Sequence, residues 1–365
     1  MKINFIDLQA QYQDYKQEID TEIHKVLDSS GYIGGPQLTE LSDTLAAYTG
    51  AKYCLPVSSG TDALVVALMA YDIGAGDEVI TTPFTFIATA EVISFLGAKP
   101  VFVDIDETTY NIDPKQIEAA ITANTKAIMP VALYGQPADM DEINAIAKKH
   151  GIPVIEDACQ SFGAEYKGKK SCNLSEIGCT SFFPSKPLGC YGDGGAVFTS
   201  DDALYEKMKS IANHGQGERY VHKYIGLNGR LDAIQAAVLN VKMRYFAGEV
   251  SKRESIGQAY SAKLTDADVI TPTIKDDRTT PYAQYSIRVK DRATMSKALG
   301  DAGIPTAVHY PIPLYKQEAF NDLNINANDF PISEKVSNEI MSLPMSPYLA
   351  SEDQDLIVST IKENV

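Results

Sequence analysis

Residues 53–64 have the sequence YCLPVSSGTDAL, in which a short apolar run passes directly into the start of a helical pattern. The run 53–57 predicts a strand, and a helix is expected from Thr61. At such a turn, free backbone N–H groups and the positive end of the helix dipole form an anion site. Gly60 lets the backbone approach the anion closely, and Thr61 adds a hydroxyl donor. The natural ligand is a phosphate, although Ser and Thr are also ordinary helix N-caps. The segment is neither a Walker P-loop nor a GxGxxG fingerprint, which disfavours ATP and NAD.

The alternation of short apolar runs and helical patterns continues from residue 52 to residue 200. Further strands are predicted at 78–82, 100–104, 127–132, 153–157, 179–183 and 195–199, and helices from Thr85, Pro114 and Met140. Strands that alternate with helices predict a mostly parallel sheet with helices on both faces, so the fold class is α/β. Ligands of open α/β sheets bind at the carboxyl ends of the strands. We therefore expect the chemistry of the protein at that edge.

Residues 154–160, VIEDACQ, form an apolar run that ends in two carboxylates. Side chains alternate along a strand, so Glu156 and Asp157 point to opposite faces and at most one of them faces the cleft. A carboxylate fixed in the cleft can hold a proton on a ring nitrogen. The alternative is a strand-terminal Asp that caps the following turn.

Residues 181–187, SFFPSKP, place Lys186 among apolar neighbours, and a glycine-rich run at 189–195 follows. Burial disfavours the ammonium form of a lysine, so its pKa falls and the neutral amine becomes available to form a Schiff base. Most lysines are solvated surface charges, but Phe182 and Phe183 argue against a solvated position. Together the three segments supply a phosphate cradle, an acid for a ring nitrogen and an amine for an aldehyde. Pyridoxal 5′-phosphate (PLP) has the three groups that these segments would bind: a phosphate, a ring nitrogen and an aldehyde.

The sequence pattern changes beyond Gly248. A helical pattern covers 231–246, and after it we expect a long helix, a strand at 284–289, another helix and a Pro-rich segment at 309–313. These elements predict a smaller α+β domain. The predicted division is a large PLP-binding domain at 1–248, which includes the N-terminal segment, and a small domain at 249–365.

The composition excludes several classes of protein. The chain has 365 residues, 44% of them hydrophobic and 22% charged, with a net charge of −16, which is typical of a folded protein and disfavours nucleic acid and membranes as partners. Asp7 and Asp14 argue against a secretory signal, and no apolar run approaches the length of a membrane span. Five cysteines without a paired framework predict reduced thiols in the cytoplasm. No CxxC pair occurs, so no metal site is expected.

The three motifs together resemble the DegT/DnrJ/EryC1/StrS family of nucleotide-sugar aminotransferases, which have PLP fold type I, the fold of aspartate aminotransferase. The likeness runs from FIDL at 5–8 to SLPM at 342–345 and includes SGTDAL at 59–64, IEDACQ at 155–160 and PSK at 184–186. Within the family, the strings SCNL at 171–174, FFPSKPLGCYGDGG at 182–195 and AVHYPIPL at 307–314 are most similar to a particular group of enzymes. These enzymes aminate UDP-2-acetamido-2-deoxy-ribo-hex-3-uluronic acid for the lipopolysaccharide O-antigen.

The resemblance implies roles for individual residues. Lys186 would bind PLP covalently, and Asp157 would pair with the pyridine nitrogen. The other implied cofactor contacts are Gly60, Thr61 and Ser181 at the phosphate, Phe86 on the ring face, Gln160 beside the ring, and Asn228 from the second subunit of a homodimer with shared sites. The substrate contacts expected are Arg230, whose guanidinium suits a carboxylate, His309 and Tyr310. The roles of Tyr191 and Cys159 stay open.

The activity implied by the resemblance is transfer of an amino group from L-glutamate to the C3 ketone of the UDP-linked uronic acid. The alternatives are a different keto sugar, such as a dTDP-3-keto- or 4-keto-6-deoxyhexose, and a non-catalytic PLP-binding regulator. A regulator of that kind would need a DNA-binding module, and the sequence has no basic recognition helix. The dehydratases of the family replace the lysine with histidine, so the presence of Lys186 disfavours that branch.

Overall fold

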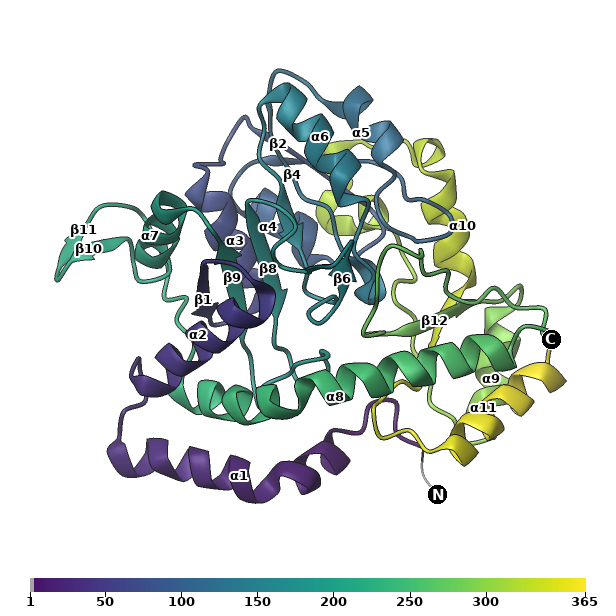
Figure 1. The fold of residues 1–365 in the computed structure, drawn as a ribbon. Coiled ribbons are helices and arrows are strands. Elements are labelled where there is room, and N and C mark those ends of the chain that lie inside the picture. The colour runs from purple at the N-terminus through teal and green to yellow at the C-terminus, as the bar shows by residue number, and fades with distance from the viewer. Residues whose placement is uncertain (1–2) are drawn as a thin grey trace.

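A parallel sheet forms the centre of the molecule (Figure 1). The computed structural model describes residues 3–365. Within them, a three-stranded segment in the order β3-β2-β4 and a four-stranded segment in the order β5-β8-β9-β1 are joined by the parallel bridges Ile128↔Val154 and Val131↔Asp157. In this joined sheet β9 runs in one direction, and the other six strands run in the opposite direction. The predicted α/β class with a mostly parallel sheet is therefore confirmed. The strands are β1 (Tyr53–Val57), β2 (Glu78–Thr81), β3 (Lys99–Phe102), β4 (Thr125–Ile128), β5 (Ile155–Asp157), β8 (Ile177–Ser181) and β9 (Gly195–Thr199).

Helices cover both faces of the sheet because successive side chains on each strand point to opposite sides. Val197 packs with the apolar residues of α3 (Gly60–Ala70), α4 (Ala88–Phe95) and α7 (Asp202–Ile211). Its neighbour Phe198 packs instead with α2 (Pro36–Thr49) and α8 (Ala233–Lys263). Helices α5 (Pro114–Ala120) and α6 (Met140–His150) cover the β2 and β4 end of that second face. Helix α4 begins at Ala88, three residues after the predicted start at Thr85.

Helix α8 is one continuous helix of 31 residues, so the boundary predicted at residue 248 lies inside it. Its last turns join a second core around the antiparallel pair β12 (Tyr285–Arg288) and β13 (Ile340–Leu343), covered by α9 (Arg292–Asp301) and α11 (Ser351–Glu363). Ile3 packs in this second core as well. The segment 314–330, in contrast, packs on Ala90 of α4 and Phe102 of β3. The division at residue 248 stays a prediction.

The remaining elements lie outside these two sheets. They are α1 (Leu8–Ser29), α10 (Pro331–Glu339), the hairpins β6 (Glu165–Tyr166) with β7 (Lys169–Lys170) and β10 (Gln216–Glu218) with β11 (Val221–His222), and the 3-10 helices η1 (Leu133–Gly135), η2 (Leu314–Lys316), η3 (Glu318–Leu323) and η4 (Ala327–Asp329). The β10–β11 hairpin projects from the body of the molecule (Figure 1). Among residues 3–365, none of the helices combines the length and apolar character needed to cross a membrane.

A buried carboxylate fastens α1 to α8. Glu249 is 5% exposed and accepts hydrogen bonds from the Gln11 amide at 2.8 and 3.0 Å and from the hydroxyls of Tyr15 at 3.0 Å and Tyr348 at 3.1 Å. These donors come from α1 and from the loop before α11, so one side chain joins three segments that are distant in sequence. Hydrogen bonds to a buried charged group are stronger than those between neutral groups.

Replacement of this carboxylate tests its structural role. We expect Glu249→Ala to lower the free energy of unfolding by about 3 kcal/mol, because the Gln11, Tyr15 and Tyr348 donors lose their buried acceptor. Urea denaturation measures the change. Glu18→Ala is the control, since Glu18 pairs with Arg244 on the exposed surface, and it should change stability by less than about 0.5 kcal/mol. Equal effects of the two variants would contradict the assignment.

Candidate active site

Nine of the eleven predicted site residues line one cavity of about 450 Å³ at the carboxyl ends of β1, β5 and β8. The nine are Gly60, Thr61, Phe86, Asp157, Gln160, Ser181, Lys186, His309 and Tyr310. Asn228 and Arg230 do not line it. This is the sheet edge where parallel α/β folds bind ligands.

The start of α3 forms one wall of the cavity. The Ser59 hydroxyl caps the helix by accepting from the Asp62 N–H at 3.0 Å, and the first N–H groups of a helix have no partner within it. A Cβ atom on Gly60 would lie 2.6 Å from Cβ of Ser181, and one on Gly195 would lie 2.5 Å from the backbone of Ser59. Three backbone segments therefore meet where only glycine fits, and Thr61 and Ser181 hydroxyls border the turn.

Asp157 is fixed at the end of β5. The side chain is 3% exposed, its Oδ2 accepts from the Thr89 hydroxyl at 2.8 Å, and its Oδ1 accepts from the Cys159 N–H at 3.2 Å. Glu156 points to the other face, where it accepts from the Ser171 hydroxyl at 2.6 Å, and burial raises its pKa. The predicted alternation of the two carboxylates is confirmed, because only Asp157 lines the cavity.

Lys186 lies on the loop between β8 and β9. Removal of its ammonium group from water lowers the pKa of Lys186, although Cys159 and Asp157 nearby act in the opposite direction. The loop is held by the N–H of Lys186 donating to Phe183 O at 2.8 Å. From α8, the buried Nζ of Lys242 donates to Gly189 O at 2.6 Å. A lowered pKa leaves a larger fraction of neutral amine at neutral pH, as a nucleophilic lysine requires.

The two residues whose roles stayed open lie in different places. Cys159 lines the cavity, and burial raises its pKa well above the ordinary value. The thiol is therefore protonated at neutral pH, which does not suit a nucleophile. Tyr191 does not line the cavity, and its ring instead packs against Tyr12 at 5.9 Å and lies 4.4 Å from Nζ of Lys242.

The far wall of the cavity comes from the C-terminal third of the chain. Burial lowers the pKa of His309 to about 4, so the imidazole is neutral at pH 7, and its Nδ1 lies 2.8 Å from the Ser342 hydroxyl. The Tyr310 hydroxyl lies 3.4 Å from Nε2 of Gln160. Gln284 completes this wall. Sequence reasoning did not find Gln284, because a single Gln before a strand carries no motif.

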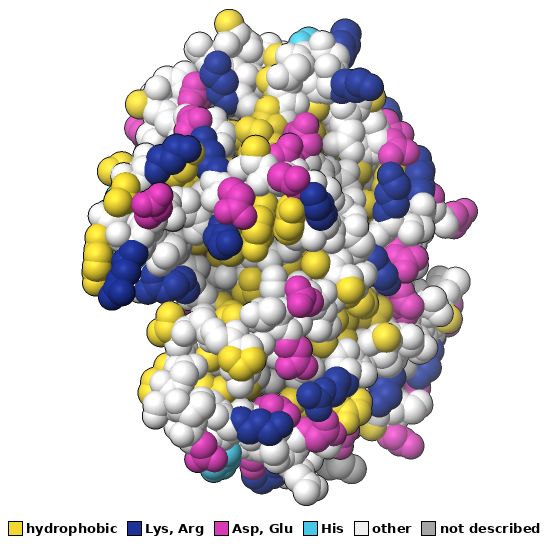
Figure 2. Space-filling view, turned by 60° about the vertical axis from the view of Figure 1, so that its left-hand side comes forward, with side chains coloured by type: hydrophobic (Ala, Val, Ile, Leu, Met, Phe, Trp, Pro, Cys, Tyr) yellow, Lys and Arg dark blue, Asp and Glu magenta, His cyan; other side chains and the backbone are white. Residues whose placement is uncertain are grey.

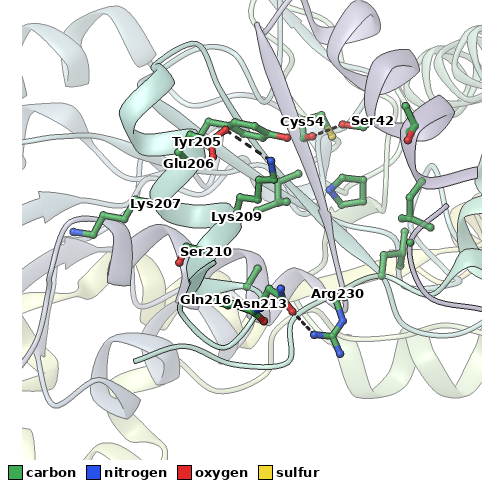
Figure 3. A pocket seen from close by; sticks show the side chains of 18 of the residues that line it. Ser42, Cys54, Tyr205, Glu206, Lys207, Lys209, Ser210, Asn213, Gln216 and Arg230 are labelled. Atoms are coloured by element: carbon green, nitrogen blue, oxygen red, sulfur yellow. Dashed lines mark hydrogen bonds and ion pairs between the residues drawn. The ribbon is translucent and has the colours of Figure 1, made fainter. Parts of the chain in front are cut away.

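Asn228 and Arg230 lie on the other side of β1. Arg230 pairs with Val57 in an isolated bridge and lines a separate cavity of about 1070 Å³, shown in Figure 3. Its Nη1 donates to the Asn213 amide oxygen at 2.5 Å, and its Nε is buried without a partner. Asn228 pairs with Asn213 in another bridge. Within a single chain, neither residue therefore reaches the site of Lys186.

The chemistry of the 450 Å³ cavity fits PLP. The N-terminus of α3 with Gly60, Thr61 and Ser181 suits a dianionic phosphate, the buried Asp157 carboxylate suits a protonated ring nitrogen, and the amine of Lys186 suits an aldehyde. Within residues 3–365, no three His, Cys, Asp or Glu side chains are grouped as metal ligands are. All five cysteines are unpaired.

Comparison with known proteins gives a family that agrees with this chemistry. Residues 13–362 match the DegT/DnrJ/EryC1/StrS aminotransferase family. The chain is 53% identical over 359 residues to UDP-2-acetamido-2-deoxy-3-oxo-D-glucuronate aminotransferase of Pseudomonas aeruginosa, covering 98% of this chain and 99% of that protein.

Two solved structures share the fold along nearly the whole chain. The first is a DegT DnrJ EryC1 StrS aminotransferase from Brucella abortus, with 40% identity, a TM-score of 0.96 and coverage of 99% of both chains. The second is NtdA from Bacillus subtilis with bound cofactor PMP, with 32% identity, a TM-score of 0.89 and coverage of 95% of this chain and 81% of that chain. The fold is thus PLP fold type I, and the chain belongs to the DegT/DnrJ/EryC1/StrS family as a pyridoxal phosphate-dependent sugar aminotransferase.

Proposed function

We propose that the protein transfers an amino group from L-glutamate to the C3 ketone of a UDP-linked 2-acetamido-2-deoxy-3-oxo-uronic acid, as a step in the synthesis of lipopolysaccharide O-antigen. The observation that carries this proposal is the 53% identity, over 98% of the chain, to an aminotransferase named for that sugar. The reaction has two halves, in which glutamate leaves its amino group on the cofactor and the ketosugar then takes it up.

The proposed roles of the cavity residues follow from their positions. Gly60, Thr61 and Ser181 would hold the phosphate, Phe86 would lie on the ring face and Gln160 beside the ring. The Asp157 carboxylate would accept a hydrogen bond from the protonated ring nitrogen, and its bonds to Thr89 and Cys159 hold it in place. When bound, PLP supplies a conjugated ring into which the electron pair at the reacting carbon delocalises. The amine of Lys186 would move the proton between the donor Cα and the C4′ atom of the cofactor.

The charges around the cavity support a shared site in a homodimer. Among the described residues that line it, Lys186 is the only cation, while Asp157 and Asp193 are both present. Glutamate carries two carboxylates and the uronic acid a third, and a carboxylate is bound best by a guanidinium. Arg230 has a buried Nε without a partner but lies on another face of its own chain. We infer that Arg230 and Asn228 of one subunit serve the cavity of the other.

Exposed apolar side chains also favour such a dimer. Tyr32 and Ile33 near α2, and Tyr220, Val221 and Ile225 in or near the β10–β11 hairpin, are large hydrophobic residues exposed to between 46% and 86%. Figure 2 shows hydrophobic side chains gathered in a hollow of the surface. Exposed apolar surface of this kind marks an interaction site. Unpaired cysteines and a net charge of −16 agree with the cytoplasm as the proposed location, without nucleic acid or membrane as a partner.

The first prediction concerns the covalent attachment of PLP. Reduction of the PLP-loaded protein with borohydride should add one pyridoxyl phosphate group, the mass of PLP less one oxygen atom, to the wild-type chain and none to Lys186→Ala. Among the described residues that line the cavity, only Lys186 carries an amine. Mass spectrometry of the intact chain measures this difference. Lys290→Ala, which removes an exposed lysine, should be labelled like the wild type. A labelled Lys186→Ala chain would overturn the assignment.

The second prediction concerns the sugar carboxylate. Wild-type kcat/KM should favour the uronate over the neutral UDP-N-acetyl-3-dehydro-α-D-glucosamine by about 100-fold, and Arg230→Ala should abolish this preference, because a charge-assisted bidentate contact is lost. Arg244→Ala, on the exposed face of α8, should keep it. A variant without Arg230 that still discriminates would remove the carboxylate assignment. Activity only with neutral keto sugars would favour the alternative substrates.

The third prediction concerns sharing of sites between subunits. Lys186→Ala and Arg230→Ala homodimers should each be nearly inactive. After random subunit exchange, half of the dimers are mixed and each has one site with both residues intact, so the mixture should regain about a quarter of the wild-type activity. Each variant carried through the same exchange alone is the control. A mixture that stays inactive would show that Arg230 acts within its own chain.

A further inference from the structure

Two buried threonines form a chain of hydrogen bonds that ends on Asp157. The Thr89 hydroxyl lies 2.8 Å from Oδ2 of Asp157, and the Thr85 hydroxyl lies 3.3 Å from the Thr89 hydroxyl. Both threonines are 1% exposed, and both line the same cavity as Lys186. The chain of hydrogen bonds therefore connects the turn before α4 and the first turn of α4 to the end of β5.

The carboxylate fixes the direction of this chain. An ionised carboxylate only accepts hydrogen bonds, so the single hydroxyl proton of Thr89 points to Asp157. The Thr89 oxygen then accepts from the Thr85 hydroxyl. The other carboxylate oxygen, Oδ1, accepts from the Cys159 N–H at 3.2 Å. Each oxygen of Asp157 thus receives a hydrogen bond from the protein and keeps acceptor capacity for a ligand.

The turn that carries Thr89 also carries Phe86. The N–H of Thr89 donates to Phe86 O at 3.3 Å, and the Phe86 side chain is 53% exposed where it lines the cavity. On the other side of Thr89, Ala90 is fully buried in α4. One short segment with a fixed backbone therefore presents an aromatic ring to the cavity and a hydroxyl to the acid.

A hydroxyl donor at the acid changes where the proton lies between a carboxylate and a ring nitrogen. The proton can lie on the nitrogen, which gives an ion pair, or on the carboxylate, which gives a neutral pair. Burial favours the neutral pair, because both charges of the ion pair lose their water. Donors to the carboxylate stabilise its charged form and so favour the ion pair. The ion pair is the useful state, because a positively charged ring attracts the electron pair of the reacting carbon more strongly.

We propose that Thr89 is a positioning residue that keeps the proton on the pyridine nitrogen of PLP through its hydrogen bond to Asp157. This inference rests on the proposed function, in which Asp157 pairs with that nitrogen, and it adds a residue that acts through the acid. Thr85 is the second link, because its hydroxyl donates to the Thr89 oxygen and leaves the Thr89 proton for Asp157.

The test observes the ring nitrogen directly, by ¹⁵N NMR of enzyme loaded with PLP that is labelled at this atom. Thr89→Val keeps the branched shape of the side chain and removes the hydroxyl. We expect the ¹⁵N resonance of this variant to move from the wild-type position toward that of an unprotonated pyridine. The glutamate half-reaction should slow about tenfold, as the loss of one hydrogen bond to a charged group implies. Thr89→Ser keeps the hydroxyl and should give the wild-type result in both measurements.

Thr81→Val is the matched control. Thr81 is a fully buried threonine of β2 whose hydroxyl donates to Met129 O at 2.8 Å, and it does not line the cavity. Its replacement should leave the ¹⁵N resonance unchanged. Thr89→Ala takes the place of Thr89→Val if that variant does not bind PLP. A resonance at the wild-type position without the Thr89 hydroxyl, or an equal displacement in Thr81→Val, would overturn the inference.

Asp157→Asn separates this inference from the function on which it rests. We expect its ¹⁵N resonance to move at least as far as that of Thr89→Val, because an amide carries no charge to hold the proton on the nitrogen. A wild-type resonance in Asp157→Asn would overturn the proposed role of Asp157 itself. A displaced resonance in Asp157→Asn but not in Thr89→Val would keep that role and overturn the one assigned to Thr89.

Discussion

The close contact of three backbone segments at Gly60, Ser181 and Gly195 determines the geometry of the active site. The start of α3, the end of β8 and the start of β9 approach until no Cβ atom would fit at either glycine. Because Lys186 follows β8 by a few residues, this contact sets the distance between the phosphate cradle and the lysine. Asp157 is placed by its own strand, which pairs with β8 in parallel register. One packing constraint therefore brings together a phosphate site, an amine and an acid.

The electrostatics of the site separate the cofactor from the substrates. In the proposed roles, Lys186 and Asp157 act on the cofactor. Gln160, Gln284, His309 and Tyr310 on the remaining wall are uncharged at neutral pH, and Asp193 there is acidic. A cavity without a free cation binds carboxylates poorly, so we infer that charge recognition comes from a second subunit through Arg230. In this arrangement, residues of the C-terminal part of the chain would make hydrogen bonds between neutral groups.

Much of this arrangement can be predicted from the sequence, because strong local patterns determine it. The β-branched runs identify the seven strands of the main sheet, and the SGTDAL, IEDACQ and PSK motifs identify Gly60, Thr61, Asp157, Gln160 and Lys186 of the cavity. Three features could not be predicted in this way. The sequence predicts separate helices before and after Gly248, but α8 is continuous there. Gly248 lies exposed on α8, where a glycine costs only about 1 kcal/mol, and buried residues on both sides of it hold the helix in place. The roles proposed for Asn228 and Arg230 depend on a second subunit, and Gln284 joins the cavity only when two distant parts of the chain meet.

The most direct test of the account is a cycle of absorption spectra on one sample of PLP-loaded protein. L-glutamate should replace the band of the PLP form with that of pyridoxamine phosphate. After removal of glutamate and 2-oxoglutarate, UDP-2-acetamido-2-deoxy-3-oxo-D-glucuronate should restore the original band at a stoichiometry of one sugar per site. Restoration would establish both halves of the proposed transamination. A spectrum that glutamate leaves unchanged, or that this ketosugar fails to restore while another nucleotide keto sugar succeeds, would contradict it.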